Sequence, residues 1–128
     1  YIYTDGSSLR AYEAVGPGAH AFDGTTRRWN AARLEGYLGA LAPADGGRPR
    51  LPPGGFETLD PTAMAAESVI LGLRTDRGVP LAMAHEPPLA DAFGWALAAE
   101  LLDVTGDDRI VLTTRGRLLS NELFLRLV

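Results

Sequence analysis

A stretch rich in glycine and proline near the middle of the chain constrains the fold more than any other feature. Between residues 43 and 55, eight of the thirteen residues are Gly or Pro. Neither the interior of a helix nor a central strand accepts these residues at such density. The sequence therefore predicts a linker over residues 43–59, which separates a first segment, residues 1–42, from a C-terminal domain, residues 60–128.

The first segment alternates short apolar or aromatic runs with turns. Strands are predicted over Tyr1–Tyr3, Tyr12–Val15 and Ala19–Phe22, and turns at Asp5-Gly6 and Gly16-Pro17-Gly18. Because the chain begins with Tyr1 rather than Met, we expect it to be a piece of a longer protein.

One helix is predicted after these strands. Asn30 is a favourable N-cap, because its side-chain oxygen can accept a hydrogen bond from the unpaired N–H groups of a first helical turn. Leu34, Tyr37, Leu38 and Leu41 follow at spacings of three and four residues and therefore share one helical face. The proline that opens the linker ends this helix.

Two helices are predicted in the first half of the C-terminal domain. Asp60-Pro61 marks the start of one, with an N-cap residue followed by Pro at the first helical position. Pro87-Pro88 opens the other, which is expected to continue to Leu102. Its apolar residues recur every four positions and share one face: Leu89, Phe93, Leu97 and Leu101.

The pattern then changes to period two. Leu102–Val104 and Arg109–Leu112 flank a polar turn and predict a β-hairpin. Thr114 is predicted to cap a final helix. Its apolar residues are expected to pack on the other helices: Leu118, Leu119, Leu123 and Leu127. Since helix, turn, helix, hairpin, helix is the winged-helix order, we expect an α+β fold with a mainly helical, winged-helix-like C-terminal domain.

The charge distribution argues against a nucleic-acid partner. The net charge is -4, from 12 Arg and 16 acidic residues. The helix before the hairpin carries Asp91 and Glu100 and no cation, although a helix in the major groove needs cationic or amide side chains. The hairpin turn, Asp107-Asp108, would lie against phosphate.

The sequence gives little support for catalysis or metal binding by this chain alone. Cysteine is absent, which excludes disulfides, thiolate zinc sites and iron–sulfur ligation here. The two histidines, His20 and His85, are too few for a His-rich metal site. No apolar run approaches the roughly 18 to 20 residues of a membrane span. We therefore expect no catalytic residue, no metal site and no membrane span, and a cytoplasmic location.

One loop is a candidate ligand-binding site. Gly16-Pro17-Gly18 is followed by Ala19 and His20, so the backbone could approach a ligand closely where no large side chain stands in the way. The spacing matches neither a dinucleotide-binding loop nor a Walker A loop. The alternative interpretation is a tight turn that carries a partly buried histidine.

Three motifs in order resemble a known family. The first is Gly16–His20, followed by Arg28-Trp29-Asn30 and Tyr37-Leu38. The second is Glu67 with Leu71-Gly72-Leu73-Arg74 and Gly78-Val79. The third is Leu112-Thr113-Thr114-Arg115-Gly116-Arg117-Leu118-Leu119-Ser120-Asn121-Glu122. From about Tyr12 onward, the chain resembles the C-terminal region of the radical-SAM, oxygen-independent coproporphyrinogen III oxidase-like (HemN/HemW) family, which includes haem chaperones.

This resemblance implies a place in a larger protein. Residues 1–42 would complete a radical-SAM barrel, and the rest of that barrel would be the chain's partner. The parent protein would hold S-adenosylmethionine and a 4Fe-4S cluster. The parent reaction would be oxidative decarboxylation of coproporphyrinogen III propionates, with no catalysis by this chain itself. Gly16, Gly18, Ala19 and His20 match the family loop at the cofactor and substrate end of the barrel.

Two alternatives stay open beside the oxidase. One is a haem-binding chaperone of the same family without oxidase activity, so that the ligand is haem rather than a porphyrinogen. The other is a winged-helix domain that binds a partner protein.

Overall fold

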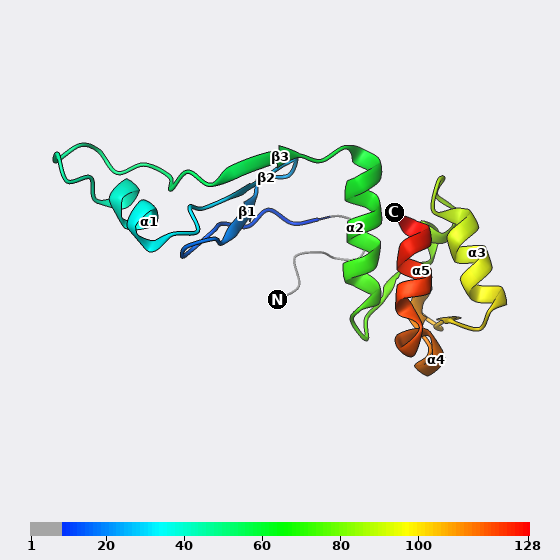
Figure 1. Ribbon diagram of the computed structural model, residues 1–128. Helices are drawn as coiled ribbons and strands as arrows, with labels where there is room; N and C mark the ends of the chain where they lie inside the picture. The colour runs from blue at the N-terminus through cyan, green and yellow to red at the C-terminus, as the bar shows by residue number, and fades with distance from the viewer. Residues whose placement is uncertain (1–8) are drawn as a thin grey trace. The chain divides into compact units, whose positions relative to one another are not determined.

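The computed structural model describes residues 9–128 (Figure 1). The predicted strand at Tyr1–Tyr3 and the turn at Asp5-Gly6 lie outside the described residues. The described part is α+β, as expected from the sequence, with five α-helices and two three-stranded antiparallel sheets. It divides into two compact units, the sheet unit, Arg10–Asp60, and the helical unit, Pro61–Val128, to which Leu9 also belongs.

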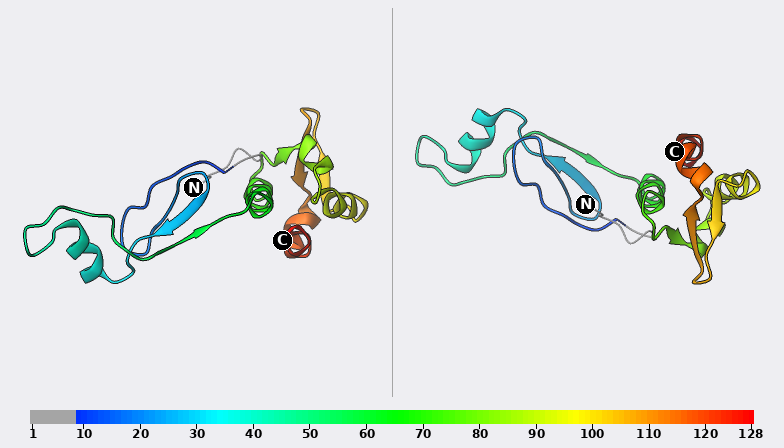
Figure 2. Two further views of the ribbon diagram at one scale, coloured as in Figure 1. Left: turned by 90° about the horizontal axis from the view of Figure 1, so that it is seen from above. Right: turned by 90° about the horizontal axis from the view of Figure 1, so that it is seen from below.

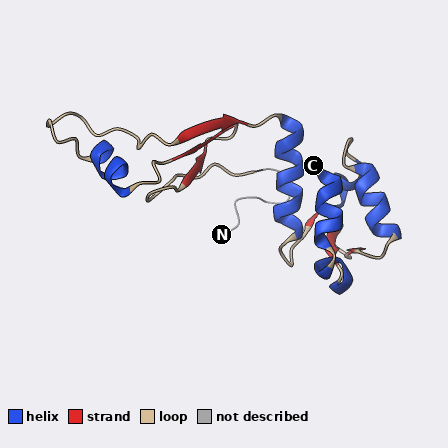
Figure 3. Ribbon diagram, in the orientation of Figure 1, coloured by secondary structure: helices blue, strands red, loops and turns tan. Residues whose placement is uncertain are grey.

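The sheet unit is built on three antiparallel strands in the order β1-β2-β3 (red in Figure 3). They are β1 (His20–Phe22), β2 (Thr26–Trp29) and β3 (Gly55–Thr58). The predicted strand at Ala19–Phe22 is thus confirmed as β1. The strand predicted at Tyr12–Val15 is wrong, because that segment contributes only a single bridge from Tyr12 to Phe22.

Strand β3 lies within the segment that was expected to be a linker, residues 43–59. It pairs with β2 so that Arg28 lies opposite Phe56 and Trp29 lies opposite Gly55. Gly55, one of the residues that argued against a strand, is therefore part of one. The separation of the chain into three segments remains a prediction.

The helix of the sheet unit, α1 (Leu34–Leu41), begins later than predicted. Its N-cap residue is Arg33, without a side-chain hydrogen bond, so the prediction that Asn30 caps this helix is wrong. The predicted apolar face is present, but Leu34, Leu38 and Leu41 are exposed in this chain. Only Ala40 of this helix is buried.

The helical unit contains the second sheet, whose strands lie in the order β4-β6-β5. The strands are β4 (Val79–Pro80), β5 (Leu102–Val104) and β6 (Arg109–Leu112), and the predicted hairpin is confirmed as β5 and β6. The helices are α2 (Pro61–Leu73), the 3-10 helix η1 (Leu81–His85), α3 (Ala90–Ala98), α4 (Thr114–Leu118) and α5 (Ser120–Leu127). Helix α5 packs against both α2 and α3 (Figure 1, Figure 2).

One apolar core holds the helical unit together. Its largest fully buried side chains come from helices α2, α3 and α5 and from the sheet: Val69, Leu73, Val79, Phe93, Ile110 and Leu123. Helix α3 ends at Ala98, four residues earlier than predicted, and Glu100 has a φ of 59°, which no helix accepts. Leu97 is consequently only half-buried, whereas Phe93 is fully buried.

The final helix also differs from the prediction. Thr113 rather than Thr114 is the N-cap, and its Oγ1 accepts a hydrogen bond from the Gly116 N–H at 2.9 Å. The helix is broken at Leu119 into α4 and α5, so Leu118 and Leu119 are exposed instead of packed. Leu123 and Leu127 are buried, as predicted.

Thr113 and Gly116 also join helix α4 to the start of the hairpin. The Thr113 hydroxyl donates to the Glu100 carbonyl at 2.9 Å, and the Thr113 N–H donates to the Leu101 carbonyl at 3.0 Å. A Cβ at Gly116 would collide with that same Leu101 carbonyl oxygen. Two residues of the third motif, Thr113 and Gly116, are therefore explained by this joint between hairpin and helix.

The described residues form no barrel, so completion of a radical-SAM barrel remains a prediction, as does the winged-helix assignment. None of the helices between residues 9 and 128 has the length and apolar character needed to cross a membrane.

Candidate functional site

The loop before strand β1 is fixed by one buried side chain. Asn30, which directly follows β2, is 1% exposed. Its Nδ2 donates to the Gly16 carbonyl at 2.9 Å and, at 3.4 Å, to the carbonyl of Ala14. Its Oδ1 accepts from Nη1 of Arg28 at 3.0 Å. Asn30 therefore cannot serve as a helix cap, because both ends of its amide hold other groups.

Backbone hydrogen bonds fix the remainder of this loop. The Gly18 N–H donates to the Ala31 carbonyl at 3.1 Å, and the Asn30 N–H donates to the Ala19 carbonyl at 2.9 Å. The Gly16 N–H donates to the Tyr37 hydroxyl at 3.1 Å. The loop is thus attached both to the segment after β2 and to helix α1.

Glycine is required in this loop by conformation. Gly16 has a φ of 103° and Gly18 a φ of 68°, a region that residues with a Cβ rarely adopt. A Cβ at Gly18 would meet Ala32 only at ordinary contact distances of 3.9 and 4.0 Å. The absence of a side chain at Gly18 is therefore explained by the backbone, whether or not a ligand approaches.

His20 begins strand β1 and is exposed. It pairs in register with Trp29, and the two ring centroids lie 5.6 Å apart with the planes tilted by 44°. The structure thus brings the four predicted site residues, Gly16, Gly18, Ala19 and His20, to one ordered loop beside an aromatic ring.

Two glycines that the sequence analysis did not single out position Trp29. A Cβ at Gly55 would lie 2.5 Å from Cζ2 of the indole. A Cβ at Gly54 would lie 2.6 Å from the Asn30 carbonyl oxygen. The Gly54 N–H also donates to the Trp29 carbonyl at 3.1 Å. The pair Gly54-Gly55, followed by an aromatic residue, was the only sequence signal for this close approach.

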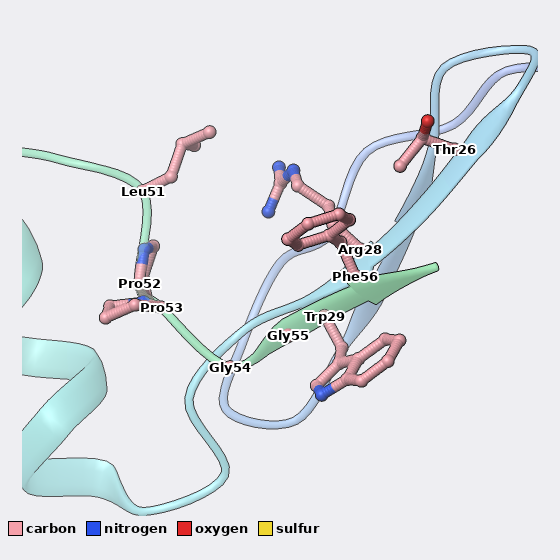
Figure 4. Close-up of a pocket in the computed structure, with 9 residues that line it drawn as sticks. All are labelled: Thr26, Arg28, Trp29, Leu51, Pro52, Pro53, Gly54, Gly55 and Phe56. Atoms are coloured by element: carbon pink, nitrogen blue, oxygen red, sulfur yellow. The ribbon is translucent and has the colours of Figure 1, made fainter. Parts of the chain in front are cut away.

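Strands β2 and β3 carry an open groove of about 390 Å³ on the face from which the Arg28 and Phe56 side chains project (Figure 4). In Figure 4 the Arg28 and Phe56 side chains project from one side of the two strands, whereas the Trp29 indole points away from them. Nine residues line the groove: Thr26, Arg28, Trp29, Leu51, Pro52, Pro53, Gly54, Gly55 and Phe56.

This groove is lined mainly by apolar residues and carries a single cation. Phe56 is 75% exposed and Leu51 is 65% exposed. Arg28 is the one charged residue of the lining. Its Nη2 donates to Oε2 of Glu13 at 2.7 Å, and the Glu13 side chain is 81% exposed.

Titratable groups elsewhere stabilise turns. Backbone N–H groups of Thr26 and Thr25 hydrogen-bond to the Asp23 carboxylate and hold its pKa below the ordinary value of 3.8. The Thr105 hydroxyl likewise lowers the pKa of Asp107 in the hairpin turn. Among residues 9–128, no three His, Asp or Glu side chains cluster in a way that could hold a metal ion.

Comparison with known proteins confirms the resemblance to the radical-SAM coproporphyrinogen III oxidase-like (HemN/HemW) family, since two curated proteins are 43% identical to this chain over 121 residues. Both are named heme chaperone HemW, from Mycobacterium tuberculosis strains CDC 1551 / Oshkosh and ATCC 25618 / H37Rv. The match covers 93% of this chain, which spans only 28% of the length of these relatives. No family model and no solved structure matches the chain.

Proposed function

We propose that this chain is part of a haem chaperone of the HemN/HemW family. The observation that carries the proposal is the 43% identity, over 93% of the chain, to proteins named heme chaperone HemW. The oxidase activity that the motifs first suggested has no such support, because neither relative is named an oxidase. Haem, rather than coproporphyrinogen III, is therefore the proposed ligand.

The family's iron–sulfur cluster does not fit the residues of this chain. Cluster iron is held by cysteine thiolates, and the sequence contains no Cys. We propose that the cluster and S-adenosylmethionine are bound by other parts of the whole protein. This chain would contribute haem contacts and structural support.

Within the chain, we propose the loop residues Gly16, Gly18, Ala19 and His20 as ligand contacts. The Asn30 amide and the backbone bonds of Gly18 and Ala19 hold the loop in one conformation, which reduces the entropy lost on binding. His20 is exposed, and an imidazole can ligate haem iron or hydrogen-bond a carboxylate.

The remaining regions would have architectural roles. We propose that residues 1–42 complete the barrel of the whole protein, because the apolar face of helix α1 is exposed in this chain and needs a partner. We propose that residues 60–128 form a winged-helix-like domain that holds the barrel or a partner protein. The order of α2, α3, the hairpin and α4 supports this assignment.

Haem titration of the full-length protein tests the proposal. We expect the wild type to bind haem, followed by Soret absorbance, and not to consume coproporphyrinogen III. His20→Ala and Gly18→Val should weaken haem binding, the first by removing the imidazole and the second by straining the left-handed backbone. Asp107→Ala, in the hairpin turn of the helical unit, is the control and should bind like the wild type.

Two results would contradict these assignments. Consumption of coproporphyrinogen III with formation of vinyl products would restore the oxidase. Loss of haem binding in Asp107→Ala, with normal binding in both loop variants, would place the ligand contact in the helical unit.

A further inference from the structure

We propose that the groove lined by strands β2 and β3 and by residues 51–54 binds a tetrapyrrole. It would contact one face of the flat macrocycle and one carboxylate, and it would not ligate the iron. This inference rests on the proposed function, which supplies the class of ligand. It adds a second binding surface, on the face of strands β2 and β3 from which the Arg28 and Phe56 side chains project (Figure 4).

The apolar lining suits a flat ligand. Phe56 presents a ring that is 75% exposed, and Leu51, at 65%, lines the same groove. In Figure 4 the Leu51 side chain projects from the loop before Pro52, and the Phe56 ring projects from strand β3. An aromatic ring stacks on a second π system, and the volume of about 390 Å³ lies in the range of small-molecule sites. One face of a macrocycle can therefore be covered here.

Charge complementarity favours a carboxylate-bearing ligand. Arg28 is the one charged residue in the lining, and no acidic residue lines the groove. A guanidinium has five N–H groups, of which two donate here, to Asn30 and Glu13. Since the Glu13 carboxylate is largely exposed, a ligand propionate can add to or replace that ion pair at little cost.

The lining residues also predict whether the groove ligates the iron of haem. None of the nine lining residues is His, Cys, Met or Tyr, the side chains that ligate haem iron. The groove should therefore bind a metal-free porphyrin as well as haem. His20 is in register with Trp29, whereas Phe56 is in register with Arg28, so variants can separate the two surfaces.

The experiment compares haem, protoporphyrin IX and protoporphyrin IX dimethyl ester as probes of the full-length protein. We expect protoporphyrin IX to bind although it has no iron, and the ester to bind more weakly than protoporphyrin IX because it lacks the carboxylates. Phe56→Ala should weaken binding of protoporphyrin IX about tenfold.

Leu118→Ala is the matched control, because it removes another exposed apolar side chain, 82% exposed, in the helical unit. It should leave both Kd values unchanged. Circular dichroism should show that each variant folds, as expected for exposed positions.

The outcomes separate this inference from the proposed function. If the wild type binds haem but not protoporphyrin IX, or if Phe56→Ala binds both like the wild type, the groove assignment is overturned and the haem chaperone stands. Equal losses in Phe56→Ala and Leu118→Ala would show non-specific adsorption and also overturn the groove. If the wild type binds no haem at all, the proposed function fails.

Discussion

Replacement of Asn30 by Ala should destabilise the sheet unit more than any other single polar substitution in it. The side chain is 1% exposed and serves two partners at good geometry, the Gly16 carbonyl at 2.9 Å and Nη1 of Arg28 at 3.0 Å. Alanine leaves the Gly16 carbonyl with only the longer bond from the Ala19 N–H, at 3.3 Å, and leaves Nη1 of Arg28 without its acceptor. Each orphaned buried group costs about 1–3 kcal/mol. Because the Gly16 carbonyl keeps one bond, and because the Arg28 side chain is 24% exposed and water can reach it, we expect about 1–3 kcal/mol in total.

Asn30→Asp separates the two halves of this interaction. The carboxylate still accepts from Arg28, but it cannot donate to the Gly16 carbonyl and places a second oxygen against it. We therefore expect Asn30→Asp to be at least as destabilising as Asn30→Ala. If the Arg28 contact alone mattered, the Asp variant would instead match the wild type.

Urea unfolding followed by tryptophan fluorescence measures the effect. Trp29 and Trp95 are the two tryptophans of the sequence, so a Trp95→Phe background leaves Trp29 to report on the sheet unit. Hydrogen exchange at the Gly18 N–H, bonded to the Ala31 carbonyl, should accelerate by the same free energy. A loss below about 0.5 kcal/mol in Asn30→Ala, with unchanged exchange, would refute the role assigned to Asn30.

Three further changes test the rest of the structure. Phe93→Ala, at a fully buried site, should cost about 3–5 kcal/mol in urea unfolding, and Leu97→Ala, at a half-buried one, clearly less; the reverse order would show that the face of α3 is misassigned. Thr113→Ala should lower the free energy of unfolding by about 1–2 kcal/mol and Thr113→Ser should restore most of it, whereas equal values for both variants would argue against the cap. Because hydrogen bonds lower the pKa of Asp23, its charge stabilises the fold above pH 3.8, and this stabilisation is lost as the pH falls through the lowered pKa. Urea midpoints of the wild type and Asp23→Asn should therefore converge on acidification, and a constant difference would contradict the shift.

Local patterns predicted the elements whose partners are close in sequence. The hairpin of β5 and β6 follows from alternation in Arg109–Leu112 and a four-residue polar turn, and both signals are contained in the hairpin itself. The start of α2 at Pro61 is equally local. Such elements need no knowledge of the remaining chain.

Elements that depend on distant partners were missed. Asn is a residue type that favours helix N-caps, but the Asn30 amide instead donates to the carbonyl of Gly16, fourteen residues earlier. Strand β3 forms because Gly54 and Gly55 allow Trp29 to approach, and Trp29 lies some 25 residues away in sequence. A pattern confined to a short window contains neither pairing.

The two candidate binding surfaces also differ in how far the sequence could predict them. The loop from Gly16 to His20 could be found because its residues are consecutive. The groove could not, because Arg28 and Phe56 become neighbours only through the register of two strands. Amphipathic spacing in α1 correctly placed Leu34, Leu38 and Leu41 on one side, but it could not say that this side would be exposed.

The close approach of Gly116 to the Leu101 carbonyl affects how motifs from this chain should be used. Every other amino acid brings a Cβ into that carbonyl oxygen, so a saturation mutagenesis screen should show Gly116 as intolerant for a reason of backbone packing. Database profiles that weight this glycine heavily will retrieve proteins with the same joint between hairpin and helix.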